Sequence, residues 1–359
     1  MESDFLIVGG GIAGISAVAR LASLGTVTLL EAEYHLAYHT SGRSAALFEP
    51  YYGRAPVVAL SLASEAHLRH ANGGVLSPRG MMLVAGAGED AAFETDRAAL
   101  GLDEIAVADA LARLPVLRAE ALSRAAFADH AWDIDTDRLI QDFAREARAA
   151  GGRIVTGARV TGLDREGGIW RAETAEGAFA GRILVNAAGA WADTIAGLAG
   201  LRPIGLTPHR RSMARIPAPG GHDVSRWPLV MGAGETWYAK PDAGALIVSP
   251  AEEDPTHPHD AWADDMVLAE GLARYEAMVS EPVTRLLASW AGLRTFAPDR
   301  VLVIGPDPAE PSFFWLAGQG GYGFQTAPAA SRLAGDLIAG RAPEIDAATV
   351  SALSPKRFS

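Results

Sequence analysis

The 359-residue sequence contains no cysteine. Disulfide bonds, iron–sulfur clusters, thiolate metal sites and a cysteinyl link to a cofactor are therefore excluded. The histidines do not follow a metal-ligand spacing, so we expect no metal site. No apolar run approaches the roughly 20 residues that span a bilayer, and no secretory signal precedes the first expected strand. We therefore expect a cytoplasmic protein without a transmembrane segment.

Positive charge is also scarce. The chain has 31 Lys and Arg against 43 Asp and Glu, a formal net charge of −12. This balance argues against a nucleic-acid partner or an anionic membrane surface, and it permits a cationic substrate without implying one. The motif G-x-S-x-G and the P-loop are absent, so the sequence gives no support to a hydrolase or a kinase. The length suits about two domains with a large core.

The start of the chain predicts a strand, a glycine-rich turn, a helix and a second strand. The apolar run at residues 5–8 is typical of a buried parallel strand, and a helical stretch at 12–24 leads to a second strand at 26–30. Glycines with the spacing G-x-G-x-x-G stand between the first strand and the helix. A glycine triplet alone would also suit an ordinary turn. The complete order of elements, however, is that of a dinucleotide-binding unit.

Each polar or glycine position in this unit has a physical role. Gly9 allows a sharp turn, Gly11 lets backbone N–H groups approach a pyrophosphate, and Gly14 lets the helix lie close to the strand. The helix N-terminus offers unpaired donors to phosphate. Glu31, twenty-two residues after Gly9, is placed to accept hydrogen bonds from a ribose diol. By itself the unit suits NAD as well as FAD.

Two later segments, at 183–189 and 318–326, narrow the prediction to FAD, and a third, at 34–46, is compatible with it. Residues 34–46 contain many small and hydrogen-bonding side chains and few large aliphatic ones. Such a segment can pass close to a flat ligand, but it suits a solvent loop with a helix N-cap equally well. An expected strand at 183–186 ends on Ala-Ala-Gly and would pack against the dinucleotide from the other side. Residues 318–326 hold four glycines before an expected helix at 328–339. That helix N-terminus would stabilise negative charge on a reduced flavin ring.

The predicted fold class is α/β: a Rossmann-like FAD-binding domain with an inserted α+β substrate domain built on a mostly antiparallel sheet. In residues 203–285, apolar and polar side chains alternate in short runs, as in a sheet that packs on one face. A helix at 262–278 is expected to cover that face. The acidic stretch 252–265 is interpreted as a solvated connection. The FAD-binding domain is expected to comprise residues 1–75, 130–203 and 286–359, and the substrate domain residues 76–129 and 204–285.

Six further motifs resemble those of the FAD-dependent amine oxidoreductases of the D-amino-acid oxidase and glycine oxidase superfamily, and those of bacterial D-arginine dehydrogenases in particular. They are TSGRSAA at 40–46, VNAAGAW at 185–191, RRS at 210–212, YAKPDAG at 238–244, WAGLR at 290–294 and QGGYG at 319–323. The likeness covers nearly the whole chain and implies a noncovalent FAD. It assigns the cofactor site to Gly9, Gly11, Ala13, Gly14, Glu31, Ala32, Thr40, Ser41, Gly42, Arg43, Ser44, Ala45, Ala46, Val160, Ala188, Gly189, Gly320, Gly321, Tyr322, Gly323, Phe324 and Gln325.

The resemblance also implies a site for a small amino-acid substrate. Arg211 and Arg294 would hold its carboxylate, a role that suits the planar guanidinium fork. Tyr238 would donate a hydrogen bond to the same carboxylate, and Tyr52 would lie near the amine. The backbone carbonyl of Gly321 would also hold that amine. The ordinary alternatives are a surface ion pair for either arginine and core packing for either tyrosine. We predict Tyr52, Tyr238 and Arg294 as the catalytic residues.

Two departures from the arginine-preferring enzymes bear on the substrate. A histidine that those enzymes place after the Ser-Ala-Ala run is Leu47 here, which removes a polar group near the amine. A glutamate that they place after the Pro-Arg pair is Met81 here, so a guanidinium side chain would lack its partner. Burying that charge unpaired costs several kcal/mol. The resemblance therefore implies a preference shifted toward neutral or apolar side chains, and Glu49 is the one nearby acid that could restore a cationic preference.

The predicted function is FAD-dependent oxidative deamination of D-amino acids. Two alternatives stay open. One is oxidation of another α-substituted acid, such as a 2-hydroxy acid, glycine or an N-methyl amino acid, since the same carboxylate clamp would serve. The other is a flavin-binding regulatory protein without catalysis. The electron acceptor, quinone or O2, is not indicated by any motif.

Overall fold

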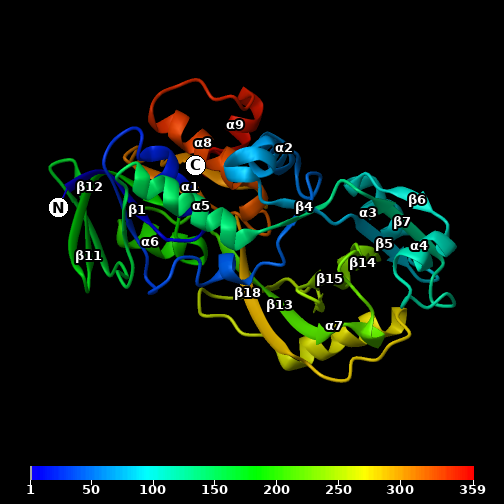
Figure 1. Cartoon of the computed structure of the whole chain (residues 1–359). Coiled ribbons are helices and arrows are strands. Elements are labelled where there is room, and N and C mark those ends of the chain that lie inside the picture. Colours follow the sequence, from blue (N-terminus) through cyan, green and yellow to red (C-terminus); the bar gives the residue numbers. More distant parts are fainter. Residues whose placement is uncertain (1) are drawn as a thin grey trace.

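Two large sheets organise the computed structural model, which describes residues 2–359. One sheet has eight strands and the other nine, and a third, smaller sheet has three strands. The eight-stranded sheet lies to the left in Figure 1 and the nine-stranded sheet to the right. The fold class is therefore confirmed as α/β. None of the helices in residues 2–359 combines the length and the apolar character that a bilayer crossing requires.

Five strands of the first sheet run parallel. Their order is β9 (Arg153–Val155), β2 (Val27–Leu30), β1 (Glu2–Val8), β12 (Gly177–Asn186) and β20 (Phe313–Ala317). The carboxyl ends of parallel strands meet at one edge of the sheet, where ligands of such folds bind. Segments from the beginning, middle and end of the chain therefore meet at this edge.

The remaining strands of the first sheet are antiparallel. β10 (Gly162–Glu166) and β11 (Ile169–Thr174) form a hairpin that pairs with the first half of β12, and β19 (Val303–Pro306) pairs with β20. The strand expected at 183–186 is thus the second half of one continuous ten-residue strand, β12.

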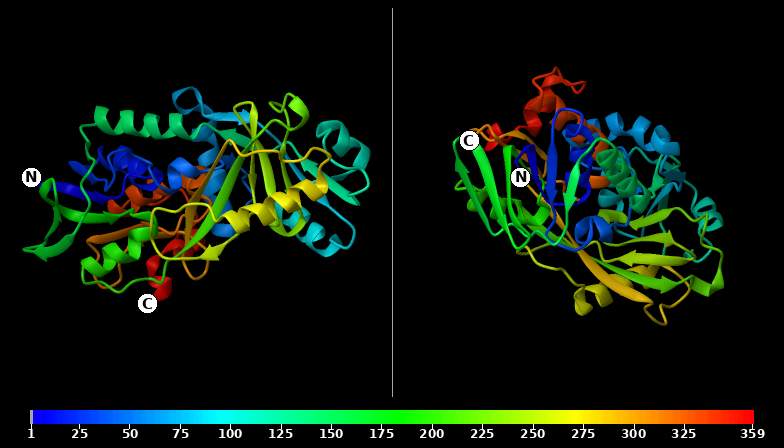
Figure 2. Two further views of the ribbon diagram at one scale, coloured as in Figure 1. Left: turned by 90° about the horizontal axis from the view of Figure 1, so that it is seen from below. Right: turned by 60° about the vertical axis from the view of Figure 1, so that its left-hand side comes forward.

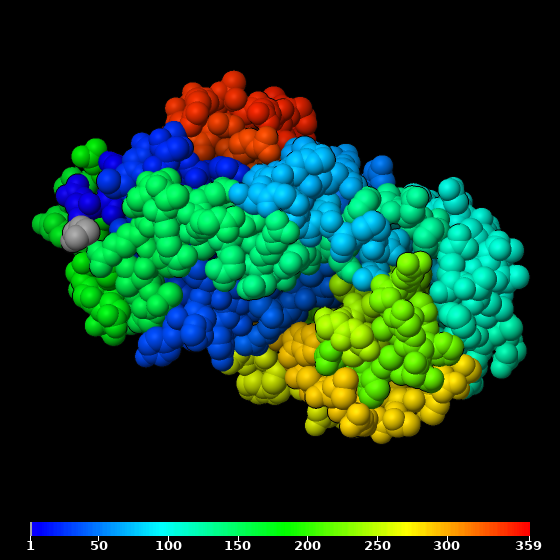
Figure 3. Space-filling view, in the orientation of Figure 1, coloured from blue at the N-terminus to red at the C-terminus, as the bar shows by residue number. Residues whose placement is uncertain are grey.

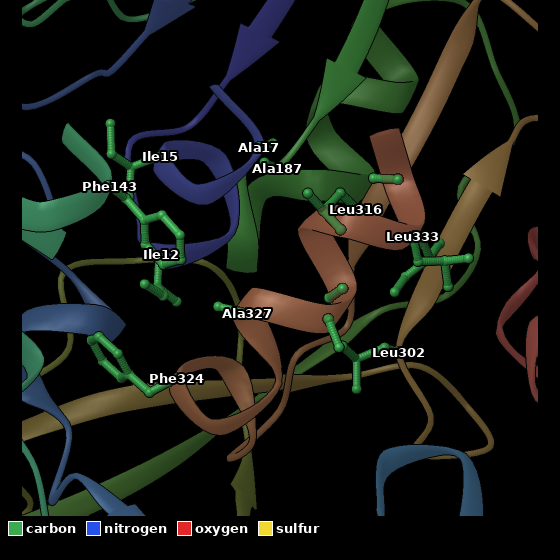
Figure 4. Close-up of a cluster of buried hydrophobic side chains, with 14 of the residues drawn as sticks. Ile12, Ile15, Ala17, Phe143, Ala187, Leu302, Leu316, Phe324, Ala327 and Leu333 are labelled. Carbon is green, nitrogen blue, oxygen red and sulfur yellow. The ribbon is translucent and has the colours of Figure 1, made fainter. Parts of the chain in front are cut away.

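Both faces of the parallel strands are buried, as parallel sheets require. On one face, Phe5 and Ile7 of β1 pack under α1 (Ile12–Leu21), α5 (Thr136–Ala149) and α8 (Gly323–Ile338). Figure 4 shows side chains from these three helices gathered in one cluster. On the other face, Leu6 and Val8 pack with residues of α6 (Ala192–Leu198). Successive residues of one strand therefore serve two separate cores.

The helix expected at 328–339 begins five residues earlier, at Gly323, so α8 passes through Pro328. Proline favours the first position of a helix, which is why the pattern placed the start there. The observed start moves the helix N-terminus into the glycine-rich turn. Helix α2 (Ala55–His70) packs beside α8.

The second sheet is antiparallel except for one pair, β14 with β5. Helix α7 (Asp265–Met278) lies across the outer face of this sheet, as the view from below shows (Figure 2). Val230, Ala239 and Val248 of the sheet belong to the same buried cluster as Leu268 and Tyr275 of α7. The strands are β5 (Met81–Ala85), β6 (Asp103–Ile105), β7 (Arg124–Ala128), β13 (Thr207–Pro217), β14 (Leu229–Gly232), β15 (Tyr238–Asp242), β16 (Ala245–Ser249), β17 (Asp254–Pro255) and β18 (Ala288–Phe296).

Strand β18 pairs along its whole length with β13 in the second sheet. The expected domain division between residues 285 and 286 falls just before this strand. The three-stranded sheet consists of β3 (Leu47–Phe48), β8 (Trp132–Ile134) and β4 (Leu76–Pro78). Its first strand, β3, comes directly after the segment 34–46. In the space-filling view the blue segment that contains residues 34–46 lies between the two halves (Figure 3).

Candidate active site

Two adjoining cavities run from the carboxyl edge of the first sheet to the inner face of the second sheet. We call the one beside Glu31 the dinucleotide cavity and the one beside Arg294 the inner cavity. Both are lined by Gly11, Thr40, Ser41, Ala187, Gly189 and Ala190, so they form one continuous path. Its length and its position at the strand ends suit an extended dinucleotide.

The glycine turn after β1 leaves no room for a side chain at Gly9 or Gly14. A Cβ atom on Gly9 would lie 2.4 Å from the carbonyl oxygen of Ala187, and one on Gly14 would lie 1.8 Å from the carbonyl oxygen of Gly9. Gly9 also has a φ of +107°, which favours glycine. Gly11 has only the Ser41 hydroxyl nearby, at 3.1 Å, and lines both cavities. The turn therefore fits a pyrophosphate beside Gly11 at the start of α1.

Glu31 follows β2 and is buried. Its two carboxylate oxygens accept the N–H groups of Gly10, at 2.5 Å, and Glu33, at 2.8 Å. Burial raises the pKa of the Glu31 carboxyl, although these two hydrogen bonds act to lower it. Because each oxygen keeps a further acceptor position and the residue lines the dinucleotide cavity, a ribose diol could be held there.

Most of the residues assigned to the cofactor line one of the two cavities. The exceptions are Gly14 beneath the turn, Gly42, whose Cβ would lie 2.4 Å from the carbonyl oxygen of Ala37, and Tyr322. Tyr322 precedes α8 and packs against the ring of Tyr52. The dinucleotide cavity is lined by Gly9, Gly11, Glu31, Ala32, Thr40, Ser41, Val160, Ala188 and Gly189. The inner cavity is lined by Ala13, Arg43, Ser44, Ala45, Ala46, Gly320, Gly321, Gly323, Phe324 and Gln325, together with Gly11, Thr40, Ser41 and Gly189.

Arg211 and Arg294 lie on the neighbouring strands β13 and β18 and both line the inner cavity. Arg211 pairs with Gly292, and Arg294 pairs with His209, so the two arginines are diagonal neighbours on the same face of the sheet. Arg211 is 2% exposed, and no acceptor among the described residues meets its Nε or Nη1. Two buried donors of this guanidinium are therefore left for a ligand.

Arg294 stays charged although it is largely removed from solvent. Burial opposes the charge, but Tyr52, Tyr238, Glu235 and Glu253 together raise the pKa of Arg294. Its Nη1 donates to the hydroxyl of Tyr52 at 3.4 Å and lies 3.8 Å from Glu253. The pair of arginines thus places strong positive charge beside the cavity, which suits an anionic group.

The interpretation of the acidic stretch 252–265 as a solvated connection was wrong for its first two residues, whereas Asp254, Asp260 and Asp265 are exposed as expected. Glu252 accepts the backbone N–H of Ser212 at 2.6 Å. Glu253 accepts from Arg211 at 3.0 Å and from Arg300 at 2.6 Å. Buried guanidinium groups need counter-charges, and this stretch supplies them from outside the cavity. Local composition cannot indicate such partners because they lie on distant strands.

Next to the arginines, on the same face of the second sheet, the wall of the inner cavity is apolar. Alternate residues of β14 and β15 face it, so Leu229 and Met231 lie beside their cross-strand partners Met81 and Tyr238. Leu47 packs against the same cluster, and both Leu47 and Met81 line the cavity. The hydroxyl of Tyr238 donates to the sulfur of Met213 at 3.3 Å.

Glu49 also lines the inner cavity but already has a cationic partner. Both of its carboxylate oxygens lie 3.1 Å from Nε2 of His130. The hydrogen bond to Glu49 raises the pKa of His130. The acid that could have favoured a cationic side chain is therefore engaged by the protein itself.

Sequence reasoning missed several residues of the inner cavity, among them Glu235, Trp237 and Met213. Glu235 stands in a short turn between two strands, where a glutamate is ordinarily solvated. No spacing or composition signal marks it, since its place depends on the pairing of β14 with β15.

The family model described as "DAO: FAD dependent oxidoreductase" matches residues 4–337. The chain belongs to this FAD-dependent oxidoreductase family. FAD is therefore its cofactor, and the glycine turn, Glu31 and the continuous cavities fit that group. The predicted superfamily is confirmed at this level.

Curated relatives in the family include the tRNA 5-methylaminomethyl-2-thiouridine biosynthesis bifunctional proteins MnmC. The protein of Burkholderia vietnamiensis (strain G4 / LMG 22486) is 30% identical over 326 residues, which is 84% of this chain and 48% of the relative. That of Burkholderia pseudomallei (strain 668) is 30% identical over 323 residues, with the same coverage. The chain thus spans about half the length of these relatives.

Solved structures share the fold over nearly the whole chain. Glycine oxidase from Geobacillus kaustophilus has a TM-score of 0.84 at 23% identity, covering 99% of both chains. L-proline dehydrogenase from P. horikoshii has a TM-score of 0.84 at 21% identity, covering 99% of this chain and 98% of that one. Iminodiacetate oxidase from Chelativorans sp. BNC1 has a TM-score of 0.82 at 20% identity, covering 98% of both.

Proposed function

We propose that this chain deaminates D-amino acids oxidatively, with a preference for neutral or apolar side chains. The observation that carries the proposal is the buried pair Arg211 and Arg294, with two unpartnered donors on Arg211, beside an apolar wall. A carboxylate suits the pair, and an apolar side chain suits the wall. The D configuration rests on the resemblance to bacterial D-arginine dehydrogenases.

In this proposal Arg211 and Arg294 bind the substrate carboxylate and fix the α-carbon in the inner cavity. The guanidinium groups are held by Glu253 and by the rigid pairing of β13 with β18, so positioning needs little rearrangement. Tyr238 and Tyr52 border the same space, and Gly321 offers its carbonyl group to the amine. The N-terminus of α8 faces the cavity through Gly323 and Phe324 and favours negative charge there.

FAD held along the two cavities, with Glu31 at one end and Gly321 at the other, would supply a hydride acceptor for the α-hydrogen. The substrate amine loses a proton to water, and the carbon–nitrogen double bond of an imino acid forms from the nitrogen electron pair as the α-hydrogen leaves. Water then converts the imino acid to a 2-keto acid and ammonia. The chain contributes orientation and charge, and Tyr52 stays protonated because burial raises its pKa.

The side-chain preference follows from Leu47, Met81 and the occupied Glu49. A guanidinium or ammonium side chain against Met81 and Leu229 would lose its hydration without gaining a partner. An aliphatic or thioether side chain would bury apolar surface there at roughly 25 cal/mol per Å². D-leucine and D-methionine are therefore expected to be better substrates than D-arginine.

A secondary amine is the second candidate substrate. The identity to the MnmC proteins and the fold shared with proteins named for L-proline and iminodiacetate favour it. Leu47 also removes one polar group expected beside a primary amine. A tRNA substrate is not part of this proposal, because the net charge of −12 opposes a nucleic-acid surface.

The deciding experiment is anaerobic reduction of the bound FAD by paired D- and L-amino acids, N-methyl amino acids and 2-hydroxy acids. We expect bleaching of the flavin absorbance by D-leucine and D-methionine. Rapid reduction by D-arginine with little by D-leucine would contradict the side-chain preference. Reduction by no ligand would favour a regulatory flavoprotein. Reoxidation with O2 or with an artificial quinone then distinguishes an oxidase from a dehydrogenase.

We further propose that the half built on the first sheet binds FAD and that the half built on the second sheet binds substrate. The pairing of β18 with β13 supports moving the last division beyond Phe296.

A further inference from the structure

Glu235 brings a carboxylate into the inner cavity from the turn Ala233–Glu235 between β14 and β15. Its backbone has a φ of +51°, in the left-handed region that non-glycine residues rarely adopt. The preceding residue, Gly234, donates its N–H to Asp96 at 2.6 Å, which holds the turn in place. Backbone strain of this kind is retained where the surrounding structure enforces it, and it is concentrated at ligand sites.

The carboxylate of Glu235 is connected to the arginine pair through one phenol. The hydroxyl of Tyr52 donates to Oε1 of Glu235 at 2.9 Å and accepts from Nη1 of Arg294 at 3.4 Å. Tyr52 therefore lies between a negative and a positive group on the cavity wall. A ligand beside this phenol meets positive charge on one side and negative charge on the other.

Glu235 differs from Glu49 and Glu253 in having no ion pair. Glu253 serves Arg211, Arg294 and Arg300, and Glu49 is paired with His130. Across residues 2–359, no Lys, Arg or His nitrogen lies within the ion-pair distance of 4.0 Å from the Glu235 carboxylate. A partly buried carboxylate at a cavity wall without a cationic partner suits a cation brought by the ligand.

We propose that Glu235 binds the amino group of the substrate as its cationic partner. This inference rests on the proposed function, since it takes the substrate carboxylate to lie on Arg211 and Arg294. The ammonium group of an amino acid is attached to the same α-carbon, so it lies within a few ångströms of that carboxylate. Glu235 thereby gives the substrate amine a polar partner. The apolar side chain of Leu47, which stands where the arginine-preferring enzymes have a histidine, cannot do so.

Two consequences follow for recognition. A ligand that carries a hydroxyl in place of the amine can donate a hydrogen bond to Glu235 but forms no ion pair, and one that carries a hydrogen there makes neither contact, so the site selects amines over 2-hydroxy acids. The carboxylate also stabilises the ammonium form of the bound substrate and raises the pKa of that amine. Because hydride leaves only once the amine has lost its proton, the rate of flavin reduction rises with pH through that pKa.

The test compares wild type with Glu235→Gln, whose amide oxygen can still accept the Tyr52 hydroxyl. Dissociation constants are measured anaerobically from the perturbation or bleaching of FAD absorbance, for D-leucine and for two analogues that lack its amine: 2-hydroxy-4-methylpentanoate and 4-methylpentanoate. We expect E235Q to weaken D-leucine binding by about 10- to 100-fold, as for loss of one hydrogen bond to a charged group. Binding of 4-methylpentanoate is expected to be unchanged or tighter, and binding of the hydroxy acid to weaken far less than that of D-leucine. The acid limb of the rate of flavin reduction is expected to move to lower pH.

Two controls separate charge from geometry. Glu235→Asp is expected to recover part of the discrimination between D-leucine and the analogues. Asp96→Asn weakens the support of Gly234 but leaves the cavity carboxylate, and it is expected to keep most of the discrimination. Equal weakening of D-leucine and both analogues in E235Q would overturn the proposal, as would loss of discrimination in D96N to the level of E235Q.

The same measurements distinguish failure of this inference from failure of the proposed function. If wild-type FAD is reduced by D-leucine and E235Q keeps both the affinity and the pH profile, only the role of Glu235 is wrong. If no amine reduces wild-type FAD, the proposed function fails and this inference fails with it.

Discussion

Met81 stands on the apolar wall of the inner cavity, beside Leu229. A carboxylate there would give a substrate guanidinium the partner it lacks. We predict that Met81→Glu raises kcat/KM for D-arginine relative to D-leucine by roughly 10-fold or more, the range of a hydrogen-bonded charge pair. Steady-state kinetics on both substrates measures the ratio. Met81→Gln is the matched control, and an equal change in M81Q would show that size rather than charge is responsible.

His130 gives the chain a defined pH dependence of stability. Its pKa is raised, chiefly by the hydrogen bond to Glu49, so the folded state binds this proton more tightly than the unfolded state. The contribution is complete below the unfolded pKa of about 6.5 and is lost as pH rises through the raised folded-state pKa. We predict that wild type exceeds His130→Gln in Tm by more at about pH 5.5 than at about pH 9. These two pH values lie on either side of the range in which His130 loses its proton.

The exposed His35 provides the control for this measurement. His35→Gln is expected to change Tm little at either pH. A difference between wild type and H130Q that grows toward alkaline pH would contradict the assignment of the stabilising form as protonated His130 with ionised Glu49.

At the scale of elements, the contact between β1 and α1 depends on Gly14. A Cβ there would lie 1.8 Å from the carbonyl oxygen of Gly9, so Gly14→Ala must push α1 away from the strand. We predict that purified G14A contains less than about a tenth of the wild-type FAD, because the phosphate-binding turn loses its geometry. The flavin-to-protein absorbance ratio measures this.

Gly197 in α6 is the matched control, since a Cβ there meets nothing within 4 Å. Gly197→Ala is expected to hold FAD normally and to gain roughly 0.5–1 kcal/mol of stability, because alanine suits a helix better than glycine. Full FAD content in G14A would show that α1 can shift without affecting the site.

Elements with strong local signals were the predictable part of this fold. The strand 5–8, its glycines and the following helix are confirmed as β1 and α1, because apolar periodicity and glycine spacing act locally. The roles of Glu235 and Glu253 depend instead on which strands pair. One stands in a turn and the other in an acidic stretch, and neither position differs in sequence from an ordinary solvated residue.

The arginine pair shows what sequence motifs can predict and what they cannot. The motifs around Arg211 and Arg294 marked both residues, and the structure places them as diagonal neighbours on β13 and β18. The sequence could not indicate that Glu253 would hold both of them, because a charge partner has no required spacing. The site residues on strands were accessible to motif reasoning, whereas the charges that balance them were not.

At the scale of the whole molecule, the segment 40–46 bonds the two halves together. Thr40 donates its hydroxyl to the carbonyl of Leu293 at 2.8 Å, and Arg43 donates to the carbonyls of Ala261 at 2.7 Å and Ala291 at 3.1 Å. The residues that line the flavin path are therefore attached to the second sheet as well. FAD binding is expected to stabilise both halves as one unit.

We predict that removal of FAD lowers Tm by about 5 °C or more, since a ligand at 100 times its Kd contributes about 2.7 kcal/mol. Differential scanning calorimetry of the holo and apo forms measures the shift. Riboflavin, which lacks the ADP portion, is expected to restore little of it because the dinucleotide cavity stays empty. Recovery with riboflavin equal to that with FAD would place the stabilisation entirely in the inner cavity.

The order of strands β1, β12 and β20 has a consequence for biosynthesis. The glycine turn leaves the ribosome before both of its neighbours, since β12 follows about 170 residues later and β20 about 310 residues later. At 5–20 residues per second, the nascent chain spends tens of seconds with the edge of β12 and the start of α1 uncovered. Capture of the cofactor is therefore among the last steps in maturation, and chains released before Phe313 would be substrates for chaperones and proteases rather than for flavin.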